Sequence, residues 1–147
     1  MKVSDVMTRT VKTTTPDVTI REAARLMADL DAGILPVAQG DRLVGMITDR
    51  DITVRAVAQG KGPDTRVEEA MTRDVKYCYE DEQLDHVVKN MARLKVQRLP
   101  VMDRNKRLVG IVSLGDIAIQ GDSSLTDTAV TGIKEPGGPH DQSEQKH

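Results

Sequence analysis

The sequence predicts an α+β protein made of two βαββα-like repeats that pack with pseudo-twofold symmetry. Two spacings support this prediction. Pro36-Val37 returns as Pro100-Val101, a spacing of 64 (100 − 36), and Asp51-Ile52 returns as Asp116-Ile117, a spacing of 65 (116 − 51). The extra residue falls between 101 and 108, where a charged run predicts a turn, and turns accept insertions.

The spacings divide the chain into three parts. We assign residues 1–62 to the first repeat and residues 63–122 to the second. Each is too small to be stable alone, so we expect them to pair. Residues 123–147 are dominated by Ser, Thr, Gly and Pro. We expect this tail to be disordered, because it buries too little to offset about 1–2 kcal/mol of backbone ordering per residue.

The first repeat is predicted to open with a short helix at residues 2–8 and a strand at 11–14. Pro16 ends the strand because proline lacks the amide hydrogen that a ladder needs. A helix follows, started by a capping box of Thr19 and Glu22. Its expected buried stripe consists of Ile20, Ala23, Ala24, Met27 and Leu30.

Strands are next expected at residues 33–38 and 43–47, around a turn. A helix at 51–58 then ends at Gly60, and a connector at 61–64 leads to the second repeat. The matching later strands are 99–102 and 108–112. The second long helix repeats the stripe as Leu84, Val87, Val88, Met91 and Leu94. Its start should be weaker, because Gln83 and His86 replace the capping box.

The composition is that of a globular protein with an aliphatic core, since the chain has no Trp or Phe and two Tyr. Residues 123–147 hold two lysines against four acidic residues, which accounts for the net charge of −2 (2 − 4). The neutral body argues against nucleic-acid binding, which needs a basic face and, for single strands, aromatic platforms. Without a signal peptide or long apolar run, we expect a cytoplasmic protein with no membrane contact.

Other reactive residues give weak signals. Cys78 lies in an alternating run, which favours a half-buried structural thiol. His86 has no second ligand at metal spacing, and His140 and His147 lie in the tail, so we predict no metal site. We assign six methionines to the core: Met7, Met27, Met46, Met71, Met91 and Met102. A basic helix edge of Lys89, Arg93 and Lys95 is interpreted as a solvated face.

One motif with chemical potential follows a strand in each repeat. Thr48-x-x-Asp51 and Ser113-x-x-Asp116 place a hydroxyl and a carboxylate at the first turn of a helix. This spacing is itself a capping box, in which both groups serve only backbone amides. The same helix start attracts phosphate or sugar oxygens, and the aspartate can accept both hydroxyls of a ribose. The motif alone leaves both interpretations open.

Taken with the Pro-Val strands, the two motifs resemble the tandem CBS (cystathionine β-synthase) domain family. The form Thr48-Asp-Arg-Asp51-Ile52 is similar to that of small stand-alone bacterial CBS-pair proteins. The resemblance covers residues 1 to about 121. It implies a regulatory module that binds AMP, ADP, ATP, S-adenosylmethionine or NAD in clefts between the repeats, and that commonly forms a homodimer.

The resemblance also implies two crossed sites. In one, Asp51 binds the ribose, Thr48 and Arg50 face the phosphates, and the second repeat holds the base and phosphate from the far side. That far side consists of Val96, Gln97 and Arg98. The other site combines Ser113 and Asp116 with residues of the first repeat, namely Thr10, Val11, Ala32, Gly33 and Ile34.

The two implied sites differ in charge. Gly115 stands where the first motif has Arg50, and Ile34 stands where the second repeat has Arg98. Because arginine forks suit phosphate oxygens, we predict that the Asp51 site prefers a di- or triphosphate or a charged nucleotide. The Asp116 site should bind weakly or take an uncharged adenosine moiety.

The base would have no aromatic partner unless Tyr77 or Tyr79 stacks on it. Gly45 and Gly110 would let it approach the backbone. Eight apolar residues would sandwich it: Ile34, Pro36, Met46, Ile47, Val96, Pro100, Ile111 and Val112. We expect micromolar or weaker affinity, near −8 kcal/mol.

The sequence therefore predicts a non-catalytic regulatory module with an adenine nucleotide as its ligand, no required cofactor and an unknown regulated protein. No nucleophile, base and orienting group occur together, so an enzyme is not expected. The alternative is a structural dimerisation or interaction module without a nucleotide ligand, in which Thr48 and Ser113 are plain helix caps.

Overall fold

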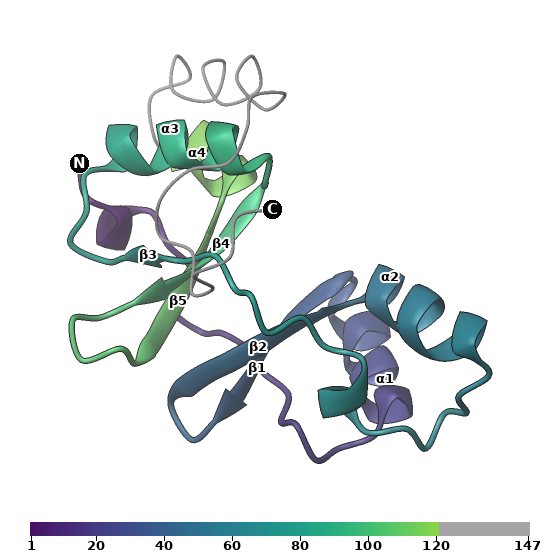
Figure 1. The fold of residues 1–147 in the computed structure, drawn as a ribbon. Coiled ribbons are helices and arrows are strands. Elements are labelled where there is room, and N and C mark those ends of the chain that lie inside the picture. Colours follow the sequence, from purple (N-terminus) through teal and green to yellow (C-terminus); the bar gives the residue numbers. More distant parts are fainter. Residues whose placement is uncertain (121–147) are drawn as a thin grey trace. The chain divides into compact units, whose positions relative to one another are not determined.

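The structure, a computed structural model, describes residues 1–120 and forms two compact units (Figure 1). The central unit is Lys12–Val75, and the terminal unit joins Met1–Val11 to the chain from Lys76 onward. The boundary expected between residues 62 and 63 divides the sequence repeats, but the compact units do not follow it. The tail predicted at 123–147 lies outside the described residues.

The central unit is a hairpin with two helical segments. It contains α1 (Ile20–Leu30), β1 (Ile34–Gln39), β2 (Arg42–Thr48) and α2 (Asp49–Asp51). The two strands are antiparallel, with Ile34 opposite Thr48. After α2 the chain continues as a π-helix, Ile52–Ala56, and a 3-10 helix, Val57–Gln59. It ends at Gly60 as predicted, where φ is 76°.

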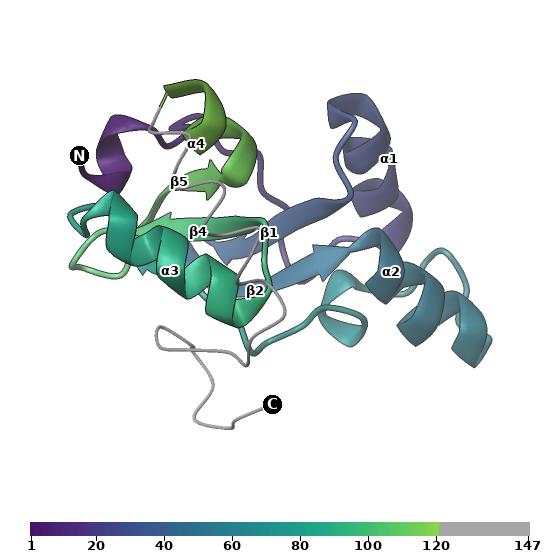
Figure 2. The same ribbon diagram turned by 90° about the horizontal axis from the view of Figure 1, so that it is seen from above.

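The terminal unit repeats this plan with one more strand. Its elements are β3 (Cys78–Tyr79), α3 (Leu84–Leu94), β4 (Arg98–Met102), β5 (Leu108–Ser113) and α4 (Leu114–Gln120). The sheet has the order β3-β4-β5, parallel between the first pair and antiparallel between the second. Figures 1 and 2 show α3 and α4 on the same side of this sheet.

The predicted opening elements are shorter than expected. A 3-10 helix, Val3–Asp5, replaces the helix predicted at 2–8, and Val67–Glu69 is its counterpart. The strand predicted at 11–14 is wrong, since only Thr14 forms a bridge, to Val37. A stretch this short forms only one or two hydrogen bonds with a neighbouring strand, which is too few to make it a β-strand.

These opening segments pack on the unit that holds the opposite repeat. Val3, Val6 and Met7 belong to the core of the terminal unit. Val67, Ala70 and Met71 belong to the core of the central unit. Each unit therefore needs a segment from both repeats to complete its core.

The two long helices differ in how they are buried. All five predicted stripe residues of α3 are buried. In α1 only Ile20, Ala23 and Met27 are, so the predicted burial of Ala24 and Leu30 is wrong. The side chain of Ala24 is a single methyl group, so this part of the predicted stripe offers little apolar surface to bury.

The two helix starts also differ. Thr19 accepts a hydrogen bond from the Glu22 amide at 3.2 Å, which is half of the predicted capping box. At α3, Gln83 provides no side-chain cap, as its sequence predicts. The Met1 carbonyl instead accepts from the Leu84 amide at 2.8 Å, so the opening segment of the chain caps this helix.

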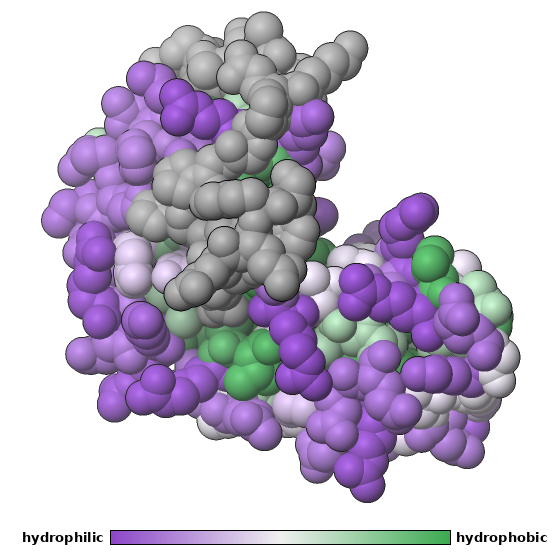
Figure 3. All heavy atoms as spheres, viewed as in Figure 1, coloured by the Kyte–Doolittle hydropathy of each residue, from purple (hydrophilic) through white to green (hydrophobic). Residues whose placement is uncertain are grey.

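The cores are aliphatic and lie between helices and strands in both units. Hydrophilic residues cover most of the face drawn in Figure 3, with small apolar areas between them. No helix within residues 1–120 is long and apolar enough to span a membrane.

Candidate functional site

The first predicted motif lies where β2 ends and α2 begins. The Asp51 amide donates to Thr48 Oγ1, and the Thr48 amide donates to Asp51 Oδ2, both at 3.0 Å. This reciprocal pair is a complete capping box, as the structural interpretation predicts. The Asp51 side chain is 14% exposed. One carboxylate oxygen thus serves the helix start, which leaves the other for a different role.

The second oxygen of Asp51 faces two groups that the sequence analysis did not assign to the site. Thr72 Oγ1 donates to Asp51 Oδ1 at 3.5 Å, and Arg55 Nε lies 3.6 Å from the same oxygen. Arg55 also donates from Nη1 to the Met71 carbonyl at 3.1 Å. All these residues belong to the central unit. Both contacts to Oδ1 are long, so neither holds that oxygen strongly.

The terminal unit repeats the arrangement. The Asp116 amide donates to Ser113 Oγ at 3.1 Å, and Thr8 Oγ1 donates to Asp116 Oδ2 at 3.5 Å. Thr8 and Thr72 follow a methionine in the two copies of one short segment, Met7-Thr8 and Met71-Thr72. This duplication was the sequence signal for them. The same hydroxyl–carboxylate contact occurs independently in each unit.

The glycines of the motif do not provide space for a base. A Cβ on Gly45 would lie 2.8 Å from Met71 Sδ and 2.9 Å from the Thr72 carbonyl oxygen. On Gly110 it would lie 2.8 Å from both Met7 Sδ and the Thr8 carbonyl oxygen. The role predicted for these glycines is therefore wrong. They let the Met-Thr segment approach the strand and reach the aspartate.

The proposed apolar sandwich is smaller than predicted. Pro36, Ile47, Pro100 and Val112 are buried in the described structure and cannot contact a ligand. Ile34, Met46, Val96 and Ile111 keep intermediate exposure. Tyr79 is also engaged, because the Arg104 guanidinium lies 4.0 Å from its ring centroid.

The predicted site residues divide between the two units. Thr48, Arg50 and Asp51 share the central unit with residues 32–34, and the Asp49 amide donates to the Gly33 carbonyl at 2.9 Å. Ser113 and Asp116 share the terminal unit with Thr10, Val11 and residues 96–98. Arg98 pairs with Ser113 across β4 and β5. Each aspartate thus lies with the pre-proline segment of its own repeat, and the crossed pairing stays a prediction.

The other reactive residues are held in structural contacts. Cys78 is 1% exposed, more deeply buried than predicted, and burial raises the pKa of its thiol. His86 Nε2 lies 3.6 Å from Glu82 Oε2. Among residues 1–120, no group of three or more His, Cys, Asp and Glu side chains could hold a metal ion.

Comparison with known proteins shows which family the chain resembles. The CBS domain model matches residues 3–57 and 67–120, and no catalytic domain is found within residues 1–120. The CBS domain-containing protein YhcV of Bacillus subtilis is 41% identical over 132 residues, covering 89% of this chain and 94% of YhcV.

Two solved structures are similar in sequence and fold. Hypoxic Response Protein I with two coordinated zinc ions has a TM-score of 0.73 at 33% identity, covering 81% of this chain and 98% of that chain. The CBS domain pair of protein MJ0100, in complex with 5-methylthioadenosine and S-adenosyl-L-methionine, has a TM-score of 0.70 at 36% identity. That match covers 81% of this chain and 94% of the other. The chain belongs to the CBS domain family and consists, over residues 3–57 and 67–120, of two CBS repeats.

Proposed function

We propose that the protein is a non-catalytic regulatory module that binds an adenosine-containing ligand, with AMP, ADP and ATP as the preferred candidates. In this proposal Asp51 and Asp116 accept hydrogen bonds from the ribose hydroxyls. The observation that carries the proposal is that the two carboxylate oxygens of Asp51 have different partners. Oδ2 accepts the Thr48 amide at 3.0 Å, whereas Oδ1 has only contacts of 3.5 and 3.6 Å. A ribose hydroxyl could take over Oδ1 without disturbing the helix cap.

The comparison with MJ0100 supports the ligand class. That CBS domain pair binds 5-methylthioadenosine and S-adenosyl-L-methionine, both adenosyl compounds. Which adenosyl ligand this chain takes is set by the groups around the sugar. Arg50, the neighbour of Asp51 in the chain, favours phosphates in the first site, and Gly115 at the matching position before Asp116 favours an uncharged adenosine in the second. We propose the cytoplasm as the location, where adenine nucleotides are abundant.

The proposal is tested by calorimetric titration of the full chain with AMP, ADP, ATP, NAD and S-adenosylmethionine. Asp51→Asn keeps the shape but removes the charge, and should weaken binding of a phosphorylated ligand about tenfold or more, since hydrogen bonds to charged groups are worth about 1.5–3 kcal/mol. Asp41→Asn in the β1–β2 turn is the matched charge control. Equal losses from Asp51→Asn and Asp116→Asn would refute the predicted difference between the sites.

The interaction module stays the second candidate, because Asp51 is also a complete capping residue. A melting panel with the same ligands separates the two functions. A ligand at 100 times its dissociation constant adds about 2.7 kcal/mol, which raises the melting temperature by several degrees. An unchanged melting temperature with every ligand would favour the interaction module.

We also propose a homodimer that buries the apolar groove between α1 and the helical segment after Asp51. The groove has a volume of about 630 Å³, and Val57 on its edge is 64% exposed. Nearby Val54 is 42% exposed. Val57→Lys should convert a dimer to a monomer in light scattering after size exclusion, whereas Ile119→Lys, at an exposed position of the terminal unit, should not.

A further inference from the structure

Arg55 lies on the helical segment that follows the Asp51 motif, and its side chain turns back to that motif. Arg55 Nε lies 3.6 Å from Asp51 Oδ1, and Nη1 donates to the Met71 carbonyl at 3.1 Å. The Arg55 side chain is 52% exposed, whereas that of Asp51 is 14% exposed. One guanidinium thus contacts both the carboxylate and the segment that carries Thr72, and it stays accessible to solvent.

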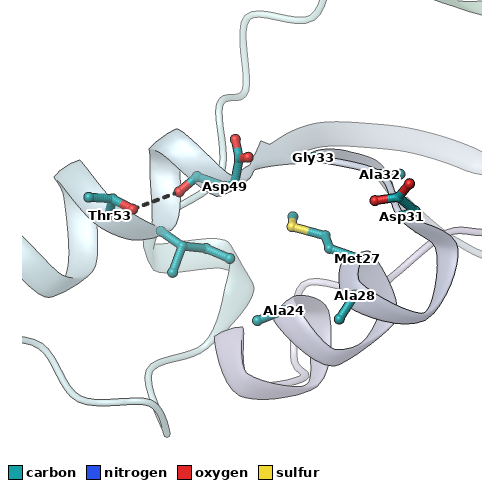
Figure 4. Close-up of a pocket in the computed structure, with 9 residues that line it drawn as sticks. Ala24, Met27, Ala28, Asp31, Ala32, Gly33, Asp49 and Thr53 are labelled. Carbon is teal, nitrogen blue, oxygen red and sulfur yellow. Dashed lines mark hydrogen bonds between the residues drawn. The ribbon is translucent and has the colours of Figure 1, made fainter.

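The helical segment that carries Arg55 has an unusual backbone. Its residues Ile52–Ala56 form a π-helix, a rare conformation that often marks a functional site. Thr53 Oγ1 donates to the Asp49 carbonyl, four residues back, at 3.0 Å (Figure 4). A side-chain bond of this kind competes with the backbone amides for the carbonyl and often bends a helix. The Thr53 bond thus favours the irregular turn on which Arg55 lies.

The second repeat differs at both positions. Ala118 stands where the first repeat has Thr53, and Gln120 stands where it has Arg55, at the spacing of 65 that relates the two aspartates (118 − 53 and 120 − 55). The corresponding segment is α4, which is an α-helix. Glutamine carries no charge, so the second repeat has no cation at this position. A guanidinium four residues after the motif aspartate is therefore specific to the first repeat.

Arg55 lies beside the carboxylate oxygen that the proposed function gives to the ribose. Asp51 Oδ2 accepts from the Thr48 amide at 3.0 Å, so a ribose hydroxyl can bond at Oδ1 without disturbing the helix cap. A hydroxyl at Oδ1 would displace the Arg55 guanidinium. An uncharged nucleoside offers the displaced guanidinium no new partner, so its binding costs an ion pair. A 5′-phosphate offers anionic oxygens that suit an arginine fork.

We propose that Arg55 is the residue by which the first site selects a phosphorylated adenosyl ligand over an uncharged one. Before binding, Arg55 competes with the ribose for Asp51, and after binding it pairs with the phosphate. The inference rests on the proposed nucleotide function and adds to it a specificity-determining residue that the sequence analysis did not assign. It differs from the role predicted for Arg50, because Arg55 acts on the ribose as well as on the phosphate.

The test compares AMP with adenosine by calorimetric titration of the full chain, in an Asp116→Asn background that isolates the first site. Arg55→Gln installs the residue of the second repeat. It should strengthen adenosine binding about two- to fivefold, the scale of a partly exposed ion pair, and weaken AMP binding by a similar factor. Arg42→Gln, at an exposed position of β2, is the matched charge control and should leave both affinities unchanged.

The sign of the adenosine change separates selection from a structural role. A residue that only supports the fold would weaken both ligands when it is replaced. Arg55→Lys retains the positive charge and should keep most of the preference for AMP. Unchanged or weaker adenosine binding by Arg55→Gln, with AMP still bound, would overturn the role of Arg55 and leave the nucleotide function standing. No binding of either ligand to the wild-type chain or any variant would refute the nucleotide function, and this inference with it.

Discussion

Substitution of Gly45 by alanine tests how the aspartate site is assembled. The added Cβ would meet Met71 Sδ at 2.8 Å and the Thr72 carbonyl oxygen at 2.9 Å. The sulfur can move, but the carbonyl belongs to the backbone and is fixed by the Met46 amide, which donates to it at 2.9 Å. Overpacking of this kind costs about 1–3 kcal/mol.

The expected change in melting temperature follows from the size of the protein. An unfolding entropy of about 2.1 cal/mol/K per residue over the 120 described residues makes 1 kcal/mol equal to about 4 °C. Gly45→Ala should therefore lower the melting temperature by about 4–12 °C.

Gly62→Ala is the matched control, measured by the same calorimetric scan. Nothing lies within 4 Å of its added Cβ, and its φ is not in the left-handed region. Alanine at such a position stabilises by about 0.4–1 kcal/mol through the unfolded chain. If Gly45→Ala melts with or above Gly62→Ala, the Met71–Thr72 segment does not pack on β2 in solution, and the assembly described for the site is wrong.

Three further predictions concern the terminal unit. Val3→Ala should cost about 2 kcal/mol in a denaturant melt, because Val3 is fully buried, whereas Ile119→Ala, 84% exposed, should cost less than about 0.5 kcal/mol. The hydrogen bond from Arg104 lowers the pKa of Asp81, so the pair stabilises the fold above the ordinary value of 3.8 and loses that effect as pH falls below it. Arg104→Gln should return the Asp81 pKa toward 3.8 in a carboxyl ¹³C titration. Burial raises the Cys78 pKa, so a thiol reagent at pH 8 should label Cys78 only as fast as the unit opens, and immediate labelling would contradict its burial.

The regular elements could be predicted because each repeat carries clear periodicity. The apolar runs of β1, β2, β4 and β5 and the apolar stripe of α3 follow directly from the side chains. The exchange of opening segments could not be predicted. Val3, Val6 and Met7 have the same pattern as Val67, Ala70 and Met71, so either segment fits either core on sequence grounds. Only the packing decides which unit each one completes.

The candidate site shows the same limit. The Thr48–Asp51 contact is local and follows from its spacing of three residues. The Thr72 contact spans 21 residues, and no local rule predicts it. Gly45 signalled that something approaches the strand closely, but a glycine does not identify the approaching group. The sequence favoured a base, and the structure places the chain's own methionine and threonine there.

The Thr72 contact suggests how ligand binding could be transmitted. If a ribose hydroxyl bonds to Asp51 Oδ1, the contacts it replaces are the long ones from Thr72 and Arg55, because the 3.0 Å bond of the Thr48 amide uses the other oxygen. Thr72 lies in the segment that opens the second repeat, and the chain passes from the central to the terminal unit after Val75. Under the proposed function, a ligand on Asp51 would therefore act first on the residues that lead into the next unit. Thr8 has the same position relative to Asp116, four residues before the chain leaves the terminal unit at Lys12 (12 − 8). Under the proposed function, loss of either hydroxyl–carboxylate contact would therefore act on the segment that leads out of its unit, and the helix cap would remain.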